Sequence, residues 1–423
     1  MYSFPYDWAG SIDTDAIQPC RVYESTRMQP YRQCRKISEC LKNPIGSPPL
    51  AALLEKERPK NILILADDLT RPTPQTTMMP ALLDEIQRAG IPFSAVKILI
   101  ATGLHRPMTK EEISMRFGAE IAENVHVINH DSEDPDALTI LGRTADGVAI
   151  QVNRLALESD FVISSGCIEP HRVAGFSGGA KMVQPGICGK DITAAIHWKG
   201  WCTEGAEIYG IVDNPVRSEM NDIGIKAGLR FILNVVLDHA GEPYDYFAGD
   251  PIEAFNEGCK ASMALSVIDV VPADIVIVDS YPFDLDLWQA CKALSVGELV
   301  LKRGGYIILV TPCPEKLGMH SSEILSTGYL PCSRIKIAVA NKTINDLAIA
   351  CHLMALGRII EYDHLLIVSE SFSDSELAEV GLCPAKSVHE AIEFARRKLG
   401  ENATIAVLNK PCAMIPNVGK SLS

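Results

Sequence analysis

The chain has 423 residues, of which 47% are hydrophobic and 22% are charged, and its formal net charge is -14 at pH 7. This length predicts two domains of ordinary size, and the near-average composition argues against long disordered tracts. Because the balance is acidic and no run of Lys and Arg forms a basic stripe, nucleic acid is excluded as an expected partner.

The lack of a recognisable targeting signal and the usage of cysteine both point to the cytoplasm. The sequence does not open with a charged start and an apolar run, and no apolar stretch reaches the ~18 residues of a membrane span. The 13 cysteines are scattered without a C-x-x-C pair, unlike a disulfide framework or a zinc ribbon. We therefore expect a soluble, unprocessed cytoplasmic protein with reduced thiols and no membrane partner.

Short apolar, β-branched runs alternate with helical patterns along the whole chain. In the first half they predict strands that begin at Asn61, Ala95, Val125, Phe161 and Phe231. In the second half they predict strands that begin at Asp274, Tyr306, Arg334, His364 and Ala403. The alternation predicts an α/β fold with two mostly parallel sheets, and the change of pattern near Val271-Pro272 places a linker over residues 266–273.

Two polar segments follow the first two predicted strands, where open parallel sheets bind their ligands. The segment ADDLTRPTP holds Asp68 and Arg71 before prolines that stiffen the turn. It is either a capped helix start with a solvated ion pair or a clamp for a carboxylate or phosphate. His105, in TGLHRP, is by itself more typical of a surface loop than of a catalyst.

A glycine-rich segment after the strand at Phe161 is the most informative part of the sequence. EPHRVAGFSGGAKMVQPG contains His171 and Lys181 on either side of several glycines. Glycines let a backbone approach a ligand and present N–H groups to a phosphate, which favours a nucleotide-like ligand. A P-loop is excluded, because Ala180 precedes the lysine and Met182 follows it.

His197 lies sixteen positions after Lys181 in a predicted amphipathic helix and alone would be a structural residue. A zinc site built from this histidine, His105 and His171 lacks the H-E-x-x-H type of spacing.

The segment DLDLWQACKAL in the second half predicts another helix, with Trp288 and Lys292 on one face. The plain interpretation is a buried aromatic residue and a surface lysine. Alternatively, Gln289 and Lys292 face the first domain and donate to a carboxylate.

Taken together, these segments closely resemble the family of the nickel-pincer-nucleotide-dependent lactate racemase over nearly the whole chain. The resemblance begins with LKNPIGSPPL from Leu41, passes through the segments quoted above and extends to WQACK. It implies an N-terminal cofactor-binding α/β domain over residues 1–268 and a C-terminal α/β domain over residues 269–411. It also implies that residues 412–423 return to the first domain and that the active site occupies the interdomain cleft.

The resemblance implies a cofactor, a pyridinium mononucleotide that carries a thioamide and a thiocarboxylate and binds nickel. Lys181 resembles the residue that forms the covalent link, and His197 resembles the nickel ligand, which suits square-planar nickel(II). Ser177, Gly178 and Gly179 would approach the nucleotide. The proteins that synthesise this cofactor would be partners of the chain.

The resemblance also implies a racemase or epimerase that inverts the 2-carbon of a 2-hydroxy acid by proton-coupled hydride transfer. His105 and His171 resemble the pair that exchanges a proton on opposite faces of the substrate, a role that suits imidazole. Arg71 resembles a clamp for the anion of substrate or cofactor, and Asp68 its orienting carboxylate. Gln289 and Lys292 resemble substrate contacts from the second domain.

One position departs from the family pattern, since lactate racemase has a tyrosine where this chain has Trp288. Lactate-like, malate-like and larger 2-hydroxy acids therefore all remain candidate substrates. Two other functions stay open, a non-catalytic family member that carries the cofactor and a zinc hydrolase. A carrier would need Lys181 and His197 but not two opposed histidines.

Overall fold

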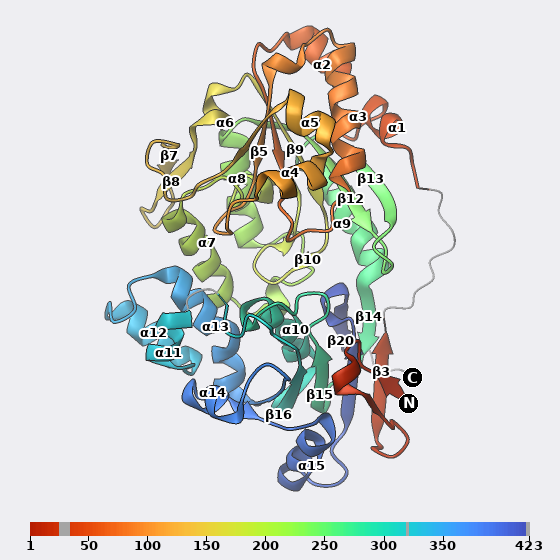
Figure 1. Cartoon of the computed structure of the whole chain (residues 1–423), viewed down its shortest axis with the longest axis vertical. Helices are drawn as coiled ribbons and strands as arrows, with labels where there is room; N and C mark the ends of the chain where they lie inside the picture. The colour runs from red at the N-terminus through yellow and green to blue at the C-terminus, as the bar shows by residue number, and fades with distance from the viewer. Residues whose placement is uncertain (25–33, 319–320, 420–423) are drawn as a thin grey trace. The chain divides into compact units, whose positions relative to one another are not determined.

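The computed structural model describes residues 1–24, 34–318 and 321–419. The chain divides into two compact units, and each is described by itself (Figure 1). The first unit contains Met28–Gly200 and Ile208–Leu265, and the second contains Met1–Arg27, Trp201–Glu207 and Ser266–Ser423.

The first unit is built on a six-stranded sheet of order β13-β12-β9-β4-β5-β6. Its strands are β4 (Ile62–Ala66), β5 (Val96–Ile100), β6 (His126–Asn129), β9 (Phe161–Cys167), β12 (Leu229–Leu237) and β13 (Pro243–Gly249). All neighbours are parallel except the edge strand β13, which is antiparallel to β12. Every residue of β4 and β9 is buried, as expected for central strands covered on both faces.

Helices and two small hairpins complete the first unit. The helices are α1 (Ile37–Lys42), α2 (Leu50–Glu57), α3 (Gln75–Arg88), α4 (Lys110–Phe117), α5 (Ala119–Asn124), α6 (Arg154–Glu158), α7 (Lys190–Cys202), α8 (Pro215–Lys226) and α9 (Glu253–Ser266). The hairpins pair β7 (Leu138–Arg143) with β8 (Ala149–Asn153) and β10 (Pro170–His171) with β11 (Gly175–Phe176). A 3-10 turn, η3 (Gly179–Met182), follows β11.

The second unit has a fully parallel six-stranded sheet of order β18-β17-β16-β15-β19-β3. Its strands are β3 (Cys20–Glu24), β15 (Ala273–Asp279), β16 (Leu301–Val310), β17 (His364–Val368), β18 (Cys383–Pro384) and β19 (Ile405–Asn409). Its helices are α10 (Leu287–Val300), α11 (Ser321–Thr327), α12 (Cys332–Ala340), α13 (Leu347–Tyr362), α14 (Asp374–Glu379) and α15 (Val388–Leu399). Two short pairs flank this sheet, β1 (Tyr2–Ser3) with β2 (Ser11–Ile12) and β14 (Val267–Val270) with β20 (Ile415–Val418).

The prediction of an α/β fold with two mostly parallel sheets is confirmed, but one predicted strand is wrong. The segment that begins at Arg334 belongs to helix α12, which starts after Pro331 and packs on α13. Cys332 and Ile335 are buried at helical spacing, whereas Ile337, which a strand would bury beside Ile335, is 59% exposed.

The domain bounds also differ from those predicted. The segment that ends at Glu24 belongs to the second unit, because β3 extends its sheet beside β19, and Figure 1 shows this red strand next to the blue end of the chain. Tyr2, Phe4 and Tyr6 pack into the core of that unit. The described part of residues 412–423 stays there too, since β20 pairs with β14. The boundary between the units falls in the last turn of α9, at Leu265, close to the predicted linker.

Among the described residues, no helix combines the length and the apolar character needed to span a membrane.

Candidate active site

The topology of the first sheet selects one place for a ligand. From β4 the chain proceeds to β5 and β6 on one side, whereas β9 and β12 lie on the other side of β4. Strand order therefore reverses between β4 and β9, and α/β sheets bind ligands beyond the carboxyl ends of their strands at such a point. The segments after β4, β5 and β9 all meet at this edge, and they carry the predicted residues of the first unit.

His105 and Asp68 form a close pair between the segments after β5 and β4. His105 Nδ1 lies 2.7 Å from Asp68 Oδ2, so in the neutral ring Nδ1 carries the donated proton and Nε2 has the lone pair. The other oxygen of Asp68 accepts hydrogen bonds from the Thr70 amide at 3.0 Å and the Thr70 hydroxyl at 2.6 Å. Burial alone would raise the pKa of Asp68, but His105 and Thr70 hold it well below its ordinary value. The carboxylate is thus charged and fixed behind the imidazole.

Asp67, to which the sequence analysis gave no role, holds the same segment in place through a buried network of hydrogen bonds. Its carboxylate accepts hydrogen bonds from Gln75 Nε2 at 3.0 Å, Arg116 Nη2 at 2.6 Å and the Thr73 hydroxyl. Burial raises the pKa of Asp67, and Arg116 opposes that rise. Because Arg116 comes from α4, this network ties the Asp68 segment to the helix that follows the His105 segment.

Arg71 meets Glu169 across the switch point. The Arg71 Nε atom lies 3.2 Å from Glu169 Oε1, and Arg71 Nη1 donates to the carbonyl of Thr70 at 3.1 Å. Only 12% of the Arg71 side chain is exposed, so the guanidinium is held in one place rather than swinging in solvent. Glu169 was not predicted, although it stands in the glycine-rich segment two residues before His171.

His171 closes the first strand of the β10–β11 hairpin. Its Nδ1 accepts hydrogen bonds from the backbone N–H groups of Val173 at 3.2 Å and Ala174 at 3.3 Å. In the neutral ring the proton therefore resides on Nε2. The rings of His105 and His171 are thus prepared differently, the first with a lone pair at Nε2 and the second with an N–H there.

The glycines between His171 and Lys181 serve packing. A Cβ at Gly175 would lie 2.1 Å from the carbonyl oxygen of Ile211, and one at Gly178 would lie 2.9 Å from that of Cys167. A Cβ at Gly179 would lie 2.8 Å from the ring of Phe255. These glycines therefore allow close packing against the protein's own atoms, and the predicted approach to a ligand stays a prediction.

The polar groups of Ser177 and Gly179 also form hydrogen bonds within the protein. The Ser177 hydroxyl donates to the Cys167 carbonyl at 2.8 Å and accepts from the Glu169 amide at 3.0 Å. The Gly179 amide donates to Asn234 Oδ1 at 2.9 Å. These contacts give Ser177 and Gly179 a structural role, and their predicted contact with a nucleotide stays a prediction.

A buried arginine from α8 donates hydrogen bonds to backbone carbonyl groups of the same segment. Arg217 donates to the carbonyls of Ala174 at 3.2 Å, Gly178 at 3.3 Å and Phe176. It is 2% exposed, and burial lowers its pKa to about 10. Neither Arg217 nor Asn234 carries a motif in the sequence, because both act on a segment distant along the chain.

Lys181 and His197 lie within electrostatic reach of each other and of His105. Burial, together with the nearby Lys181 and His105, lowers the pKa of His197 to about 4. His197 Nδ1 donates to the Thr193 carbonyl at 2.8 Å, one turn back along α7. The ring is therefore neutral near pH 7 with a lone pair on Nε2, the state that a metal ligand requires.

Trp288, Gln289 and Lys292 lie in the second unit, at the start of α10 beyond the carboxyl end of β15. Asp286 caps this helix by accepting a hydrogen bond from the Gln289 amide at 2.7 Å. The Lys292 Nζ atom lies 3.7 Å from the centroid of the Phe283 ring, a cation–π contact. The predicted position of the site between the domains stays a prediction.

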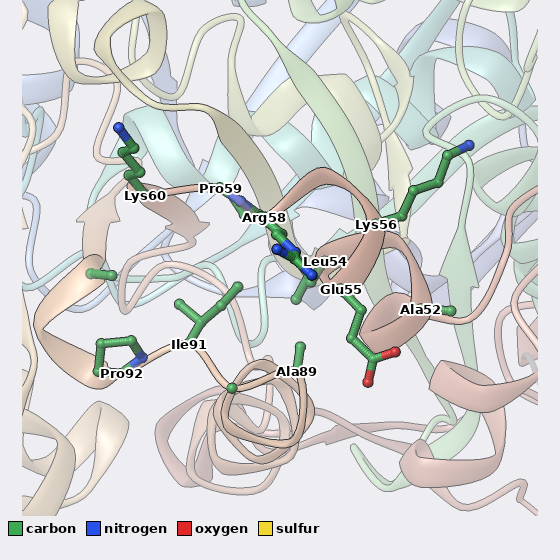
Figure 2. Close-up of a pocket in the computed structure, with 12 residues that line it drawn as sticks. Ala52, Leu54, Glu55, Lys56, Arg58, Pro59, Lys60, Ala89, Ile91 and Pro92 are labelled. Carbon is green, nitrogen blue, oxygen red and sulfur yellow. The ribbon is translucent and has the colours of Figure 1, made fainter.

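A cavity of about 1000 Å³ opens elsewhere in the first unit (Figure 2). Its lining includes Arg58 and Lys60 before β4, and Ile91 and Pro92 before β5. It therefore lies at the amino ends of these strands, the opposite edge from the histidines. None of the predicted site residues lines it.

Within the described residues, no three His, Cys, Asp or Glu side chains come together in a way that could hold a metal ion. A zinc hydrolase would need such a ligand set, and a single neutral imidazole beside a lysine does not provide one. The fold and the site define a two-unit α/β protein with histidines, a lysine and ion pairs at the switch point of a parallel sheet.

The chain belongs to the lactate racemase family. The family's N-terminal domain matches residues 11–208, and its C-terminal domain matches residues 268–415. The lactate racemase of Thermoanaerobacterium thermosaccharolyticum is 33% identical over 380 residues, and that of Lactiplantibacillus plantarum is 31% identical over 376 residues. Each alignment covers 88% of this chain and 88% of the relative.

Solved structures agree with this membership. The lactate racemase apoprotein from T. thermosaccharolyticum superposes with a TM-score of 0.84 at 32% identity, covering 90% of this chain and 92% of that one. A protein from Thermotoga maritima superposes with a TM-score of 0.70 at 23% identity, covering 91% and 98% of the two chains, which shows a shared fold.

Proposed function

We propose that the chain is a racemase or epimerase that inverts the 2-carbon of a 2-hydroxy acid with a nickel-pincer nucleotide as cofactor. The observation that carries the proposal is the grouping at one sheet edge of the His105–Asp68 pair with Lys181 and a neutral His197. Its relatives named lactate racemase support the reaction class.

The residues present fit such a cofactor. Lys181 offers an amine for a covalent link, and His197 offers a lone pair on Nε2 for nickel. Because the protein supplies one imidazole and no cage of its own among the described residues, the remaining nickel ligands would come from the nucleotide. The chemistry that this cofactor supplies when bound is reversible acceptance of hydride from the substrate 2-carbon.

The chain's own residues handle the proton and the carboxylate. His105 takes the proton of the substrate hydroxyl at Nε2, and the buried charge of Asp68 stabilises the resulting imidazolium. His171 exchanges a proton with the same oxygen when the opposite face reacts. Arg71, fixed by Glu169, binds the carboxylate, and Gln289 and Lys292 are further proposed substrate contacts. A mere cofactor carrier would have no use for the His105–Asp68 pair.

Intact-protein mass spectrometry tests the covalent part of the proposal. We expect protein coexpressed with the proteins that synthesise the cofactor to carry an added mass that Lys181→Ala lacks. The matched control is Lys190→Ala, which replaces a lysine nine residues later in the chain and should keep the added mass. Unmodified wild-type protein from such a host would contradict the proposal.

A further inference from the structure

A buried histidine of the first unit, His130, contacts two segments that carry proposed site residues. It follows the end of β6 and is 3% exposed. Its Nε2 lies 3.0 Å from the carbonyl oxygen of Cys188, in the segment that joins Lys181 to α7. Its own backbone carbonyl accepts a hydrogen bond at 2.9 Å from the hydroxyl of Thr102, three residues before His105. One buried residue therefore holds both segments.

The hydrogen bonds of the His130 ring fix its tautomer. Asn153 Nδ2 lies 3.2 Å from His130 Nδ1, and an amide nitrogen can only donate. The Asn153 amide is held in this orientation, because its Oδ1 accepts a hydrogen bond from the Leu155 backbone N–H at 3.1 Å. Burial lowers the pKa of His130, so the ring is neutral near pH 7. It therefore accepts at Nδ1 and donates from Nε2 to the Cys188 carbonyl.

Backbone hydrogen bonds join the same segments beside His130. The Gly103 amide donates to the Gly186 carbonyl at 3.0 Å. The Asn153 amide donates to the Ile187 carbonyl at 2.8 Å, so the residue that orients the His130 ring is itself bonded to the segment after Lys181. The placement of the two segments against each other therefore depends on one small set of buried hydrogen bonds.

We propose that His130 is a positioning residue, which fixes the His105 segment against the segment that joins Lys181 to His197. It acts through the Cys188 carbonyl and the hydroxyl bonded to its own carbonyl, rather than by contact with substrate. This inference rests on the proposed racemase function, in which His105 takes a proton while Lys181 and His197 hold the cofactor. A displacement on the order of 1 Å between these groups would slow the reaction, because the reacting atoms must be aligned.

Racemisation kinetics of lactate and phenyllactate test this role in cofactor-loaded protein. Thr102→Val removes the hydroxyl at nearly constant volume, and His130→Leu removes both hydrogen bonds of the ring. We expect kcat to fall by about 10-fold or more in each variant, with KM changed by less than about 2-fold. His130→Gln, whose amide can still donate to the Cys188 carbonyl, should recover most of this loss.

Ser159→Ala is the matched control. The Ser159 hydroxyl also donates to a backbone carbonyl of the first unit, that of Leu155 at 2.7 Å, but it lies before β9, at the opposite edge of the sheet from the histidines. Its loss should leave kcat and KM as in wild type.

Hydrogen exchange of the protein without cofactor, followed by mass spectrometry of its peptides, measures the positioning independently of activity. His130→Leu should speed exchange over residues 184–190 and also over residues 101–105, although the ring's own hydrogen bonds go to Cys188 and Asn153. Exchange in α2 should stay as in wild type, and Ser159→Ala should change neither segment. If His130→Leu does not fold, Thr102→Val carries both measurements, with faster exchange expected over residues 184–190.

The inference is overturned if folded variants keep the wild-type kcat and the wild-type exchange in the segment that the substitution does not alter. Absence of racemisation in wild type as well would instead contradict the proposed function. The exchange result would then decide the positioning role by itself.

Discussion

At the scale of single residues, the two proposed proton-exchanging histidines differ in what holds their rings. A buried carboxylate fixes His105, whereas two backbone N–H groups fix His171. A carboxylate stabilises the imidazolium form, and backbone donors at Nδ1 stabilise the neutral ring with its proton on Nε2. Asp68 is therefore the positioning residue of His105.

Asp68→Asn should lower racemase activity by about 10²-fold or more, because the amide neither fixes the tautomer of His105 nor stabilises its cation. The measurement is kcat for racemisation of an enantiopure 2-hydroxy acid in cofactor-loaded protein. The added mass at Lys181 should be retained, which separates a catalytic defect from failed loading. Full activity in the variant would show that Asp68 does not act through His105.

Glu169→Gln tests the clamp formed by Arg71. Without the negative partner the guanidinium loses its fixed position, so KM should rise on the order of 10-fold while kcat changes little, as expected when binding alone is weakened. Glu219→Gln is the control, because it breaks another ion pair of the first unit, with Lys199 at 2.7 Å. An unchanged KM in Glu169→Gln would remove Arg71 from substrate binding.

At the scale of elements, the sequence predicted the strands that define the switch point and the polar segments that follow them. Period-two and period-3.6 patterns are local, and so are the motifs around His105, His171 and Lys181. The run of β-branched residues over Cys332–Ala340 fits both periods, so the sequence predicts a strand where the structure has a helix. The network of Asp67 with Arg116, and the contacts of Arg217, could not be predicted, because they join segments that only the fold brings together.

The packing of Gly175 in the β10–β11 hairpin predicts how much stability its replacement costs. Gly175 and Gly147 both have positive φ, at 78° and 82°, but a Cβ meets backbone only at Gly175. Gly147→Ala should cost about 1 kcal/mol in free energy of unfolding from backbone strain alone. Gly175→Ala should cost about 3 kcal/mol or more, since the carbonyl of Ile211 must move. Equal losses in urea denaturation would contradict the packing role assigned to Gly175.

At the scale of the whole molecule, the amino-terminal segment belongs to the unit formed mainly by the carboxyl-terminal half. The Tyr2 hydroxyl donates to Asp279 Oδ2 at 3.1 Å, and β3 adds the edge strand beside β19. Short strands with few apolar residues give weak local patterns, and a partner hundreds of residues away leaves none. The family resemblance placed this segment in the N-terminal domain, whereas β3 pairs in the sheet of the second unit.

Asp279 gives this arrangement a dependence on pH. Burial raises its pKa to about 6, so between about pH 4 and 6 the folded protein binds a proton that the unfolded chain releases. The stabilising contribution of this group is therefore present below about pH 4 and is lost as the pH rises through 6, by at most about 3 kcal/mol. Asp279→Asn should remove this loss. The free energy of unfolding of the variant, relative to that of wild type, should therefore increase between pH 4.5 and 7.5. A constant difference between the two proteins over that range would contradict the raised pKa.

The central claim is that the residues gathered beyond β4, β5 and β9 racemise a 2-hydroxy acid. The most direct measurement follows the enantiomeric composition of L- and D-forms of lactate and phenyllactate, incubated separately with protein that carries the added mass on Lys181. We predict that both enantiomers of at least one acid approach the same equal mixture, and that His105→Ala abolishes the change. Unaltered enantiomers of both acids and of malate, with fully loaded wild-type protein, would contradict the account.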